Sequence, residues 1–312
     1  MVKRLFHQPV RTGGCNSVDF EQQALSTLNS LERLPDFIAV GPPRTGTTWL
    51  HEAFKGRVGL PAGAKETHYF STNYGKGMAW YLRFFRDCPR ALPAGEICAS
   101  YFSTVEAVQR IRQVAPQCRI ICTLRDPVER LYSFYKLMRH DGRTWRSFEE
   151  GLERHRGWLE RGGYAASLER WRLAFGAERV LVCFYEDLAT DPEAYLGRIC
   201  DFIGIARIKL NGTAMRESAV NAFSHAPRSY LLAKAGRRLR DWIWEHRLGW
   251  AEEAFDRAGI WRIFFAGGER FAPLDPATDA RLREFFRPEV EQLEAILERD
   301  LTAWKTPRLR AA

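Results

Sequence analysis

No stretch of the 312-residue chain approaches the roughly 18 to 20 apolar residues that a membrane span requires. The basic start Met1–His7 is followed by no apolar segment, so we expect no signal peptide. Internal repeats and low-complexity tracts are not evident either, and the 46% hydrophobic content is enough for the core of one α/β domain. We therefore expect a lead-in at 1–34 and a single domain at 35–305 with a helical insertion at about 205–265.

Cysteine is sparse and unpatterned. The seven cysteines are odd in number and scattered, several lie inside apolar runs, and no CxxC pair occurs. Cys118 and Cys122 have no nearby histidine pair that would support a metal site. The pattern predicts buried, reduced thiols, no metal and a cytoplasmic location.

A dominant charge of one sign is also missing, because 47 basic residues are interspersed with 38 acidic ones to give a net charge of +9. Only the segment from Arg228 to Arg240 gathers basic residues, and a solvated helix face explains it better than a binding patch. We expect an anionic cofactor and no nucleic-acid partner; peripheral association with a membrane surface stays open. The sequence does not indicate an oligomeric state.

A phosphate-binding loop without its usual lysine occupies residues 37–50. The apolar run Phe37–Val40 leads into Gly41-x4-Gly46, which has the Walker A spacing, but Thr47 stands where an NTPase has lysine. Arg44 offers a cation inside the loop, and we expect Thr47 and Thr48 to cap the following helix and to bond an anion. A nucleotide with a substituted 5′-phosphate fits this loop better than a triphosphate.

A second strand-to-helix junction follows the apolar run Arg119–Leu124. Arg125 stands where an NTPase often carries a metal-binding aspartate, Asp126 suits a helix N-cap, and Ser133 lies two helical turns further on. A guanidinium and a hydroxyl suit a second, separate phosphate, although Arg125 could instead bridge to Asp126 or Glu129.

Strand and helix patterns alternate along the chain. The pattern predicts an α/β, P-loop-like domain of three layers, with a central parallel sheet flanked by helices. The expected strands are 37–40, 119–124 and 180–184. The expected helices are 47–54, 103–114, 127–140 and an amphipathic 281–301, with a loop at 266–276. After the strand at 180–184, we expect Glu186 and Asp187 to cap the next helix.

The glycine loop at residues 37–50 and the junction that carries Arg125 and Ser133 together resemble the corresponding segments of the sulfotransferases that use 3′-phosphoadenosine 5′-phosphosulfate (PAPS). Lys65–Phe70 is similar to the Lys-Glu-x-His-Phe-Phe segment of the heparan sulfate branch, and the resemblance extends to Trp304. It implies PAPS as co-substrate and a general base, Glu66, with His68 and Arg44 as further catalytic residues. The cofactor-binding residues that it implies are Arg44, Thr45, Gly46, Thr47, Thr48, Trp49, Arg125, Ser133, Tyr164, Gly268 and Arg270.

Two departures from that family and three rival functions limit what the resemblance implies. Ile97 replaces a lysine beside Glu96, and the late basic loop keeps one arginine, Arg270. The expected activity is sulfuryl transfer to a hydroxyl or amine of a carbohydrate or small molecule. A P-loop kinase, a non-catalytic nucleotide-binding protein and a nucleic-acid binder are the alternatives.

Overall fold

The computed structural model describes residues 33–145, 147–160, 162–210, 225–246 and 248–307. The predicted lead-in at 1–34 lies almost entirely outside these ranges, as does Cys15. Five of the six described cysteines are buried and Cys88 is partly exposed, so the predicted burial holds for those five, and their reduced state stays a prediction.

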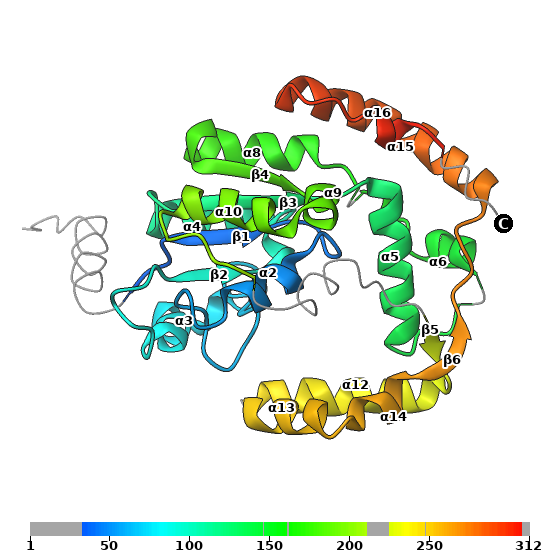
Figure 1. Ribbon diagram of the computed structural model, residues 1–312, viewed down its shortest axis with the longest axis horizontal. Coiled ribbons are helices and arrows are strands. Elements are labelled where there is room, and N and C mark those ends of the chain that lie inside the picture. The colour runs from blue at the N-terminus through cyan, green and yellow to red at the C-terminus, as the bar shows by residue number, and fades with distance from the viewer. Residues whose placement is uncertain (1–32, 146, 161, 211–224, 247, 308–312) are drawn as a thin grey trace, which may run out of the picture.

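A parallel sheet forms the centre of the molecule, which confirms the predicted α/β fold (Figure 1). Within the described residues it has four strands in the order β2-β1-β3-β4. The strands are β1 (Phe37–Val40), β2 (Gly95–Ile97), β3 (Arg119–Leu124) and β4 (Val180–Phe184). Three of them have the predicted bounds, whereas β2 was not predicted because three residues are too few to show an alternating pattern.

Helices cover both faces of this sheet in three layers (Figure 1). One face is packed by α3 (Met78–Leu82), α4 (Val105–Val114), α5 (Pro127–His140), α8 (Ala165–Phe175) and α15 (Pro276–Leu297). The other face is packed by α2 (Thr47–Phe54), α9 (Tyr185–Thr190) and α10 (Pro192–Ile203). The remaining short helices are α6 (Phe148–Arg154), α7 (Gly157–Glu160) and α16 (Thr302–Lys305).

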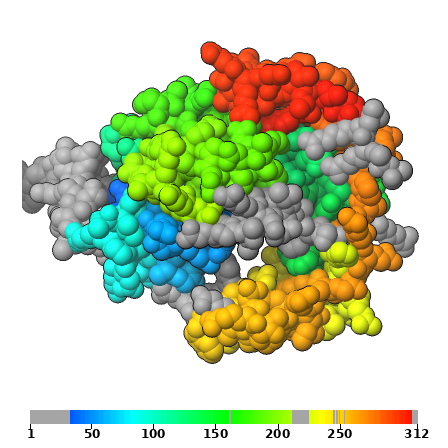
Figure 2. Space-filling model, viewed as in Figure 1, coloured from blue at the N-terminus to red at the C-terminus, as the bar shows by residue number. Residues whose placement is uncertain are grey.

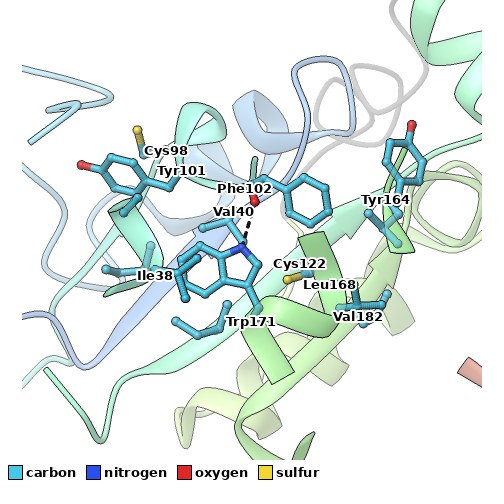
Figure 3. Close-up of a cluster of buried hydrophobic side chains, with 14 of the residues drawn as sticks. Ile38, Val40, Cys98, Tyr101, Phe102, Cys122, Tyr164, Leu168, Trp171 and Val182 are labelled. Carbon is cyan, nitrogen blue, oxygen red and sulfur yellow. Dashed lines mark hydrogen bonds between the residues drawn. The ribbon is translucent and has the colours of Figure 1, made fainter. Parts of the chain in front are cut away.

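The two faces of β1 illustrate why the sheet is buried on both sides. Ile38 and Val40 belong to the core on the α4 and α8 side, whereas Phe37 and Ala39 belong to the core on the α2 and α10 side. Consecutive strand residues point to opposite faces, so a continuous apolar run is what a doubly covered parallel strand needs. Figure 3 shows the first of these cores, centred on Trp171.

The strand order places the candidate site. β1 pairs with β2 on one side and with β3 on the other, so the chain leaves the carboxyl ends of β1 and β3 side by side. Ligands of open α/β sheets bind at such a switch in strand order. The glycine loop after β1 and Arg125 after β3 therefore meet at the same edge of the sheet.

Three helices beyond the sheet form a subdomain with a small core of its own. They are α12 (Tyr230–Glu245), α13 (Gly249–Arg257) and α14 (Ile260–Phe265), and Ile243 and Trp261 are buried between them. This helical region falls within the predicted insertion, whose boundaries stay a prediction. Arg237 of α12 pairs with Asp141, so the basic segment is partly neutralised by acidic neighbours.

Several local predictions were wrong. Residues 267–270 form strand β6 (Gly267–Arg270), which pairs antiparallel with β5 (His225–Pro227), where a loop was expected. The last long helix spans Pro276–Leu297, where 281–301 was expected, and its apolar residue Phe285 is 57% exposed. The helix expected to start at 103 starts at Val105.

The acidic pair after β4 also has another role than capping. Glu186 and Asp187 lie in the first turn of α9, and it is Asp191 whose carboxylate accepts from the backbone of α10. Glu186 instead accepts a hydrogen bond from the backbone N–H of Asp126 at 2.9 Å, which connects the first turn of α9 to the start of α5.

In the described part of the chain, no helix combines the length and the hydropathy needed to cross a lipid bilayer.

Candidate active site

The glycine loop after β1 is fastened to the neighbouring strand. Thr45 is fully buried, and its hydroxyl bonds the carbonyl of Pro42 at 2.8 Å and the hydroxyl of Thr123 in β3 at 2.7 Å. A side chain at Gly41 would meet the carbonyl oxygen of Thr123 at 2.3 Å, so only glycine allows this close approach. The Thr45 side chain thus holds the loop in shape, and the contact of Thr45 with a nucleotide stays a prediction.

The N-cap of α2 is Gly46, not a threonine. Gly46 adopts a φ of 95°, which is strained for any residue with a side chain, and no side chain caps the helix. The prediction that Thr47 and Thr48 cap α2 was therefore wrong. Thr47 is buried and Thr48 is exposed at the helix start, where unpaired backbone N–H groups favour an anion.

Arg44 sits in the loop in a strained left-handed conformation, with a φ of 80°. Its Nε donates a hydrogen bond to Ser133 Oγ of α5 at 3.0 Å, a contact that spans 89 positions of sequence. Burial, and then the like charge of Arg125, lower the pKa of Arg44 to about 10. The guanidinium stays charged at neutral pH but would be stabilised by an anion.

Arg125 completes this cationic corner. One of its terminal nitrogens donates to the backbone carbonyl of Arg44 at 3.3 Å, and its guanidinium stacks 4.2 Å from the ring centre of Tyr185. The alternative ion pair with Glu129 is long, at 3.9 Å. Tyr164 lies beneath, with its hydroxyl donating to the carbonyl of Arg125 at 3.0 Å. The two arginines and Ser133 therefore converge, as expected for a phosphate site.

The start of α5 is fixed by the predicted cap. The Asp126 carboxylate accepts from the backbone N–H groups of Val128 at 2.9 Å and Glu129 at 3.2 Å, and Pro127 opens the helix. Its second oxygen pairs with Arg283 of α15 at 3.0 Å, where both side chains are almost completely buried. This ion pair fixes Asp126, and with it the backbone at the neighbouring Arg125.

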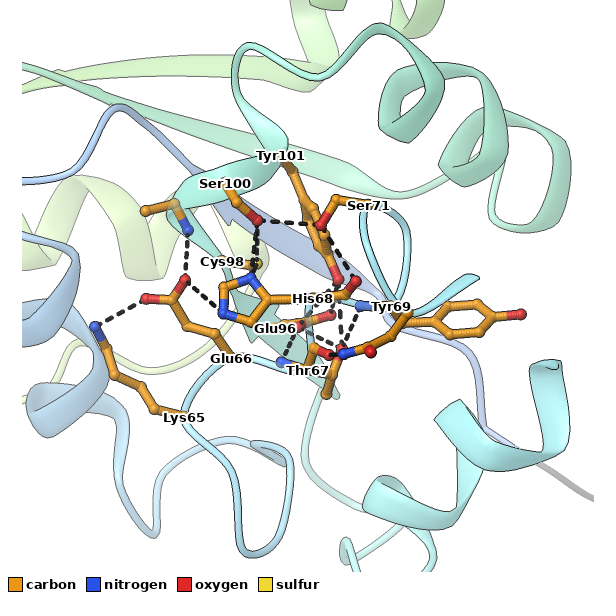
Figure 4. A network of polar contacts seen from close by, with 12 residues as sticks. Lys65, Glu66, Thr67, His68, Tyr69, Ser71, Glu96, Cys98, Ser100 and Tyr101 are labelled. Carbon is orange, nitrogen blue, oxygen red and sulfur yellow. Dashed lines mark hydrogen bonds and ion pairs between the residues drawn. The ribbon is translucent and has the colours of Figure 1, made fainter. Parts of the chain in front are cut away.

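Glu66 faces the loop from the segment after α2. Its Oε1 accepts from Lys65 Nζ at 3.1 Å, and its Oε2 accepts from the backbone N–H of Ala99 at 3.1 Å (Figure 4). Lys65 Nζ also donates to Thr48 Oγ1 at 2.9 Å, so the carboxylate is held next to the anion-binding end of α2.

His68 lies on the other side of the Glu66 carboxylate. Its Nε2 is 4.0 Å from Glu66 Oε2, and its Nδ1 is 2.9 Å from Ser100 Oγ (Figure 4). Glu66 and His68 come together because the segment turns at His68, which adopts a φ of 51°.

A buried carboxylate supports the segment between these two residues. Glu96 of β2 is fully buried and accepts from the backbone N–H and the hydroxyl of Thr67, each at 2.7 Å, and from Tyr101. Burial raises the pKa of Glu96 to about 7, and the Thr67 hydrogen bonds oppose that rise. Glu96 thus fixes the backbone between the candidate base and His68.

A cleft of ≈ 380 Å³ joins the glycine loop to the candidate base. Its lining includes Arg44, Thr48, Lys65, Glu66 and His68. A second cleft of ≈ 700 Å³ shares Thr48 and Lys65 with it and extends to α12 and α13. Figure 2 shows the hollow between the blue N-terminal part and the yellow helices. The nucleotide loop and the candidate base are therefore reached from a common entrance.

Four of the predicted site residues, Trp49, Tyr164, Gly268 and Arg270, do not line the cleft that contains Arg44 and Glu66. Trp49 is buried against Tyr195 in the core of the α2 and α10 face, and Tyr164 is 1% exposed beneath Arg125. Gly268 and Arg270 lie in β6, which pairs with β5 beside the C-terminal end of α5 (Figure 1). Their contact with a nucleotide stays a prediction.

Sequence reasoning missed Lys65 as part of the site. The residue was noted only as a neighbour of Glu66, whereas its ammonium group bridges Glu66 and Thr48. Its place directly before the candidate base in a segment rich in polar residues was the available signal. Glu96 and Ser100 were missed too, because the short strand β2, which carries Glu96 and leads to Ser100, was not recognised.

Comparison with known proteins identifies the chain as a member of the sulfotransferase domain family, whose profile matches residues 34–241, more than half of the chain. The chain is 34% identical over 190 residues to human heparan sulfate glucosamine 3-O-sulfotransferase 3B1 (Homo sapiens), a match that covers 57% of this chain and 48% of that protein. It is 30% identical over 198 residues to the bifunctional heparan sulfate N-deacetylase/N-sulfotransferase 4 of Mus musculus, covering 56% and 23%.

A similar solved structure is that of a sulfotransferase from Alicyclobacillus acidocaldarius, with a TM-score of 0.65 and 23% identity over 88% of this chain and all of the other. At this identity the likeness shows the shared fold. The chain matches about half or less of the length of the curated relatives named above.

Proposed function

We propose that this protein is a PAPS-dependent sulfotransferase that moves the sulfuryl group to a hydroxyl or amine of a carbohydrate or small molecule. The proposal depends above all on one observation: Arg44 contacts both Ser133 and Arg125, and it lines the same cleft as Glu66 and Thr48 at the start of α2. The site thus offers two separate anion positions and one carboxylate.

The geometry supports a separate role for each of these groups. The N–H groups at the start of α2 and Arg44 take the 5′-phosphosulfate, and Arg125 with Ser133 takes the 3′-phosphate. Glu66 accepts the proton of the acceptor as its oxygen or nitrogen attacks sulfur in line. The bond from sulfur to the 5′-phosphate oxygen then breaks, and adenosine 3′,5′-bisphosphate leaves.

Charge on the departing phosphate must be neutralised as that bond breaks. Arg44 stands on one side of the loop, and Lys65, which bridges Glu66 and Thr48, stands on the other. Fixed cations in a partly dry cleft stabilise such charge strongly. We infer that His68, 4.0 Å from Glu66, orients the acceptor beside the base.

Cofactor choice is the first test of this proposal. Adenosine 3′,5′-bisphosphate should bind about ten- to a hundredfold more tightly than 5′-AMP, since one charge-assisted set of hydrogen bonds is worth roughly 1.5–3 kcal/mol. Arg125→Ala should remove most of this preference. Isothermal titration calorimetry with both ligands measures it.

Arg119→Ala is the matched control, because Arg119 is exposed at the opposite end of the same strand. This variant should keep the wild-type preference. Equal affinity of the wild type for the two nucleotides would remove the 3′-phosphate assignment.

Metal dependence separates this function from that of a kinase. The fixed cations Arg44 and Lys65 should neutralise the leaving group, so transfer from labelled PAPS to a panel of sugars, phenols and amines should persist in excess EDTA. ATP with Mg²⁺ should give no phosphorylated product with the same panel. Strict dependence on Mg²⁺, or phosphoryl transfer from ATP, would show that the site belongs to a kinase-like enzyme.

A further inference from the structure

Three different metal-ligand groups meet at the floor of the cleft. One ligand atom each from Glu66, His68 and Cys98 lies within 4.8 Å of the other two. Figure 4 shows His68 between the Glu66 carboxylate and the Cys98 sulfur. Glu66 and His68 line the cleft, whereas Cys98 is fully buried behind them. An ion that entered through the cleft would meet the carboxylate and imidazole first and the thiol last.

The spacing is close to that of a tetrahedral transition-metal site. His68 Nδ1 and Cys98 Sγ are 3.5 Å apart. Zinc bonds of about 2.0–2.1 Å to nitrogen and about 2.3 Å to sulfur place two tetrahedral ligand atoms roughly 3.5 Å apart. The Glu66 Oε2 lies 4.0 Å from Nε2, the ring nitrogen that does not face Cys98. An imidazole binds an ion through one nitrogen, and the three ligand atoms lie within 4.8 Å of one another, so the side chains of Glu66 and His68 must rotate toward Cys98 to complete the set.

The kinds of ligand select the metal. A thiolate with an imidazole and one carboxylate suits Zn²⁺ and its neighbours among the transition metals, whereas Mg²⁺ and Ca²⁺ require oxygen ligands. The Cys98 thiol must lose its proton to the solvent when it ligates. The fourth position, on the cleft side, is left for water.

We propose that Glu66, His68 and Cys98 form an inhibitory Zn²⁺ site, which removes the catalytic base from use when it is occupied. The inhibitory consequence rests on the proposed function, but the metal site itself does not. Zinc bound here occupies the place of the acceptor and leaves Arg44, Arg125 and Ser133 untouched. Inhibition is therefore competitive with the acceptor, while the affinity for adenosine 3′,5′-bisphosphate stays the same.

Cobalt provides a direct readout that does not require turnover. Co²⁺ takes the same ligands as Zn²⁺, and a thiolate bound to Co²⁺ produces an intense near-ultraviolet charge-transfer band. Titration of the metal-free wild type with Co²⁺ should produce this band at about one equivalent, and Zn²⁺ should abolish it. Cys98→Ser and Cys98→Ala should each lack the band, and each should raise the Zn²⁺ inhibition constant at least about tenfold, measured against its own metal-free rate.

Cys88→Ser is the matched control, since Cys88 is the more exposed thiol and lies outside this cluster. It should keep both the band and the sensitivity to Zn²⁺. Thermal unfolding of both Cys98 variants verifies that they are folded.

A band that survives in the Cys98 variants, or its absence in the wild type, would overturn the proposed site. So would zinc inhibition that Cys98→Ser leaves unchanged. Failure of the sulfotransferase assignment would register separately, as a lack of preference for adenosine 3′,5′-bisphosphate over 5′-AMP.

Discussion

Replacing Glu66 by glutamine should lower turnover by about two to four orders of magnitude, the usual contribution of a positioned general base. The amide keeps the size of the side chain and can still accept from the Ala99 N–H, but it cannot take a proton from the acceptor. Binding of adenosine 3′,5′-bisphosphate should be unchanged, because the phosphate contacts that we propose lie at Arg44, Arg125 and Ser133. Initial rates with saturating PAPS and acceptor, together with calorimetry, check both parts.

Glu52→Gln provides the control for this experiment. Glu52 is a carboxylate of α2 that lines the second cleft, and its side chain is 45% exposed and paired with Lys55. Its replacement should leave turnover near the wild-type rate. If Glu66→Gln retained near-wild-type turnover, Glu66 would be a structural partner of Lys65, and another group would have to act as the base.

Features that depend on neighbouring residues could be predicted from the sequence. The bounds of β1, α2, β3 and α5 follow from apolar runs, a glycine spacing and the Asp126-Pro127 start signal, each contained within a few residues. Among these four elements the error was at the N-cap of α2, and it arose because Gly46 can adopt a backbone conformation that makes a threonine cap unnecessary.

Contacts between distant segments could not be predicted in this way. Lys65 contacts Thr48 across 17 positions, and Thr67 contacts Glu96 across 29, because β2 brings Glu96 back to the segment that carries Glu66. No local pattern encodes such a return. The family resemblance supplied Glu66 and His68 as candidates, but only the fold shows which groups hold them.

The most distant of these contacts leads to the second large prediction. Arg283 reaches Asp126 across 157 positions and also bonds Asp279 at 2.9 Å and the carbonyl of Trp304 at 2.8 Å. Arg283→Met would leave the Asp126 carboxylate buried without its counter-charge. Breaking one partner of such a pair costs about 3–5 kcal/mol. The midpoint of thermal unfolding should therefore fall by roughly 10 °C.

Arg287→Met is the control on the same helix, since Arg287 is exposed and pairs only with Glu284 among the contacts described. It should not lower the unfolding midpoint measurably. A loss as large as that of Arg283→Met would mean that any arginine on α15 matters in the same way, and the buried pair would have no special role.

The pH dependence of the Arg283→Met deficit tests its electrostatic cause. Burial already raises the pKa of Asp126, and Arg283 opposes that rise, so removal of Arg283 should raise this pKa further. When a carboxyl has a higher pKa in the folded protein than in the unfolded chain, the folded protein becomes less stable as the pH rises from the lower pKa to the higher one. The stability lost in Arg283→Met should thus be smaller at pH 5 than at pH 7.5. The double variant with Asp126→Asn should recover part of the lost stability, because asparagine can still cap α5 without a charge. A deficit that is independent of pH and unrelieved in the double variant would assign the loss to packing alone.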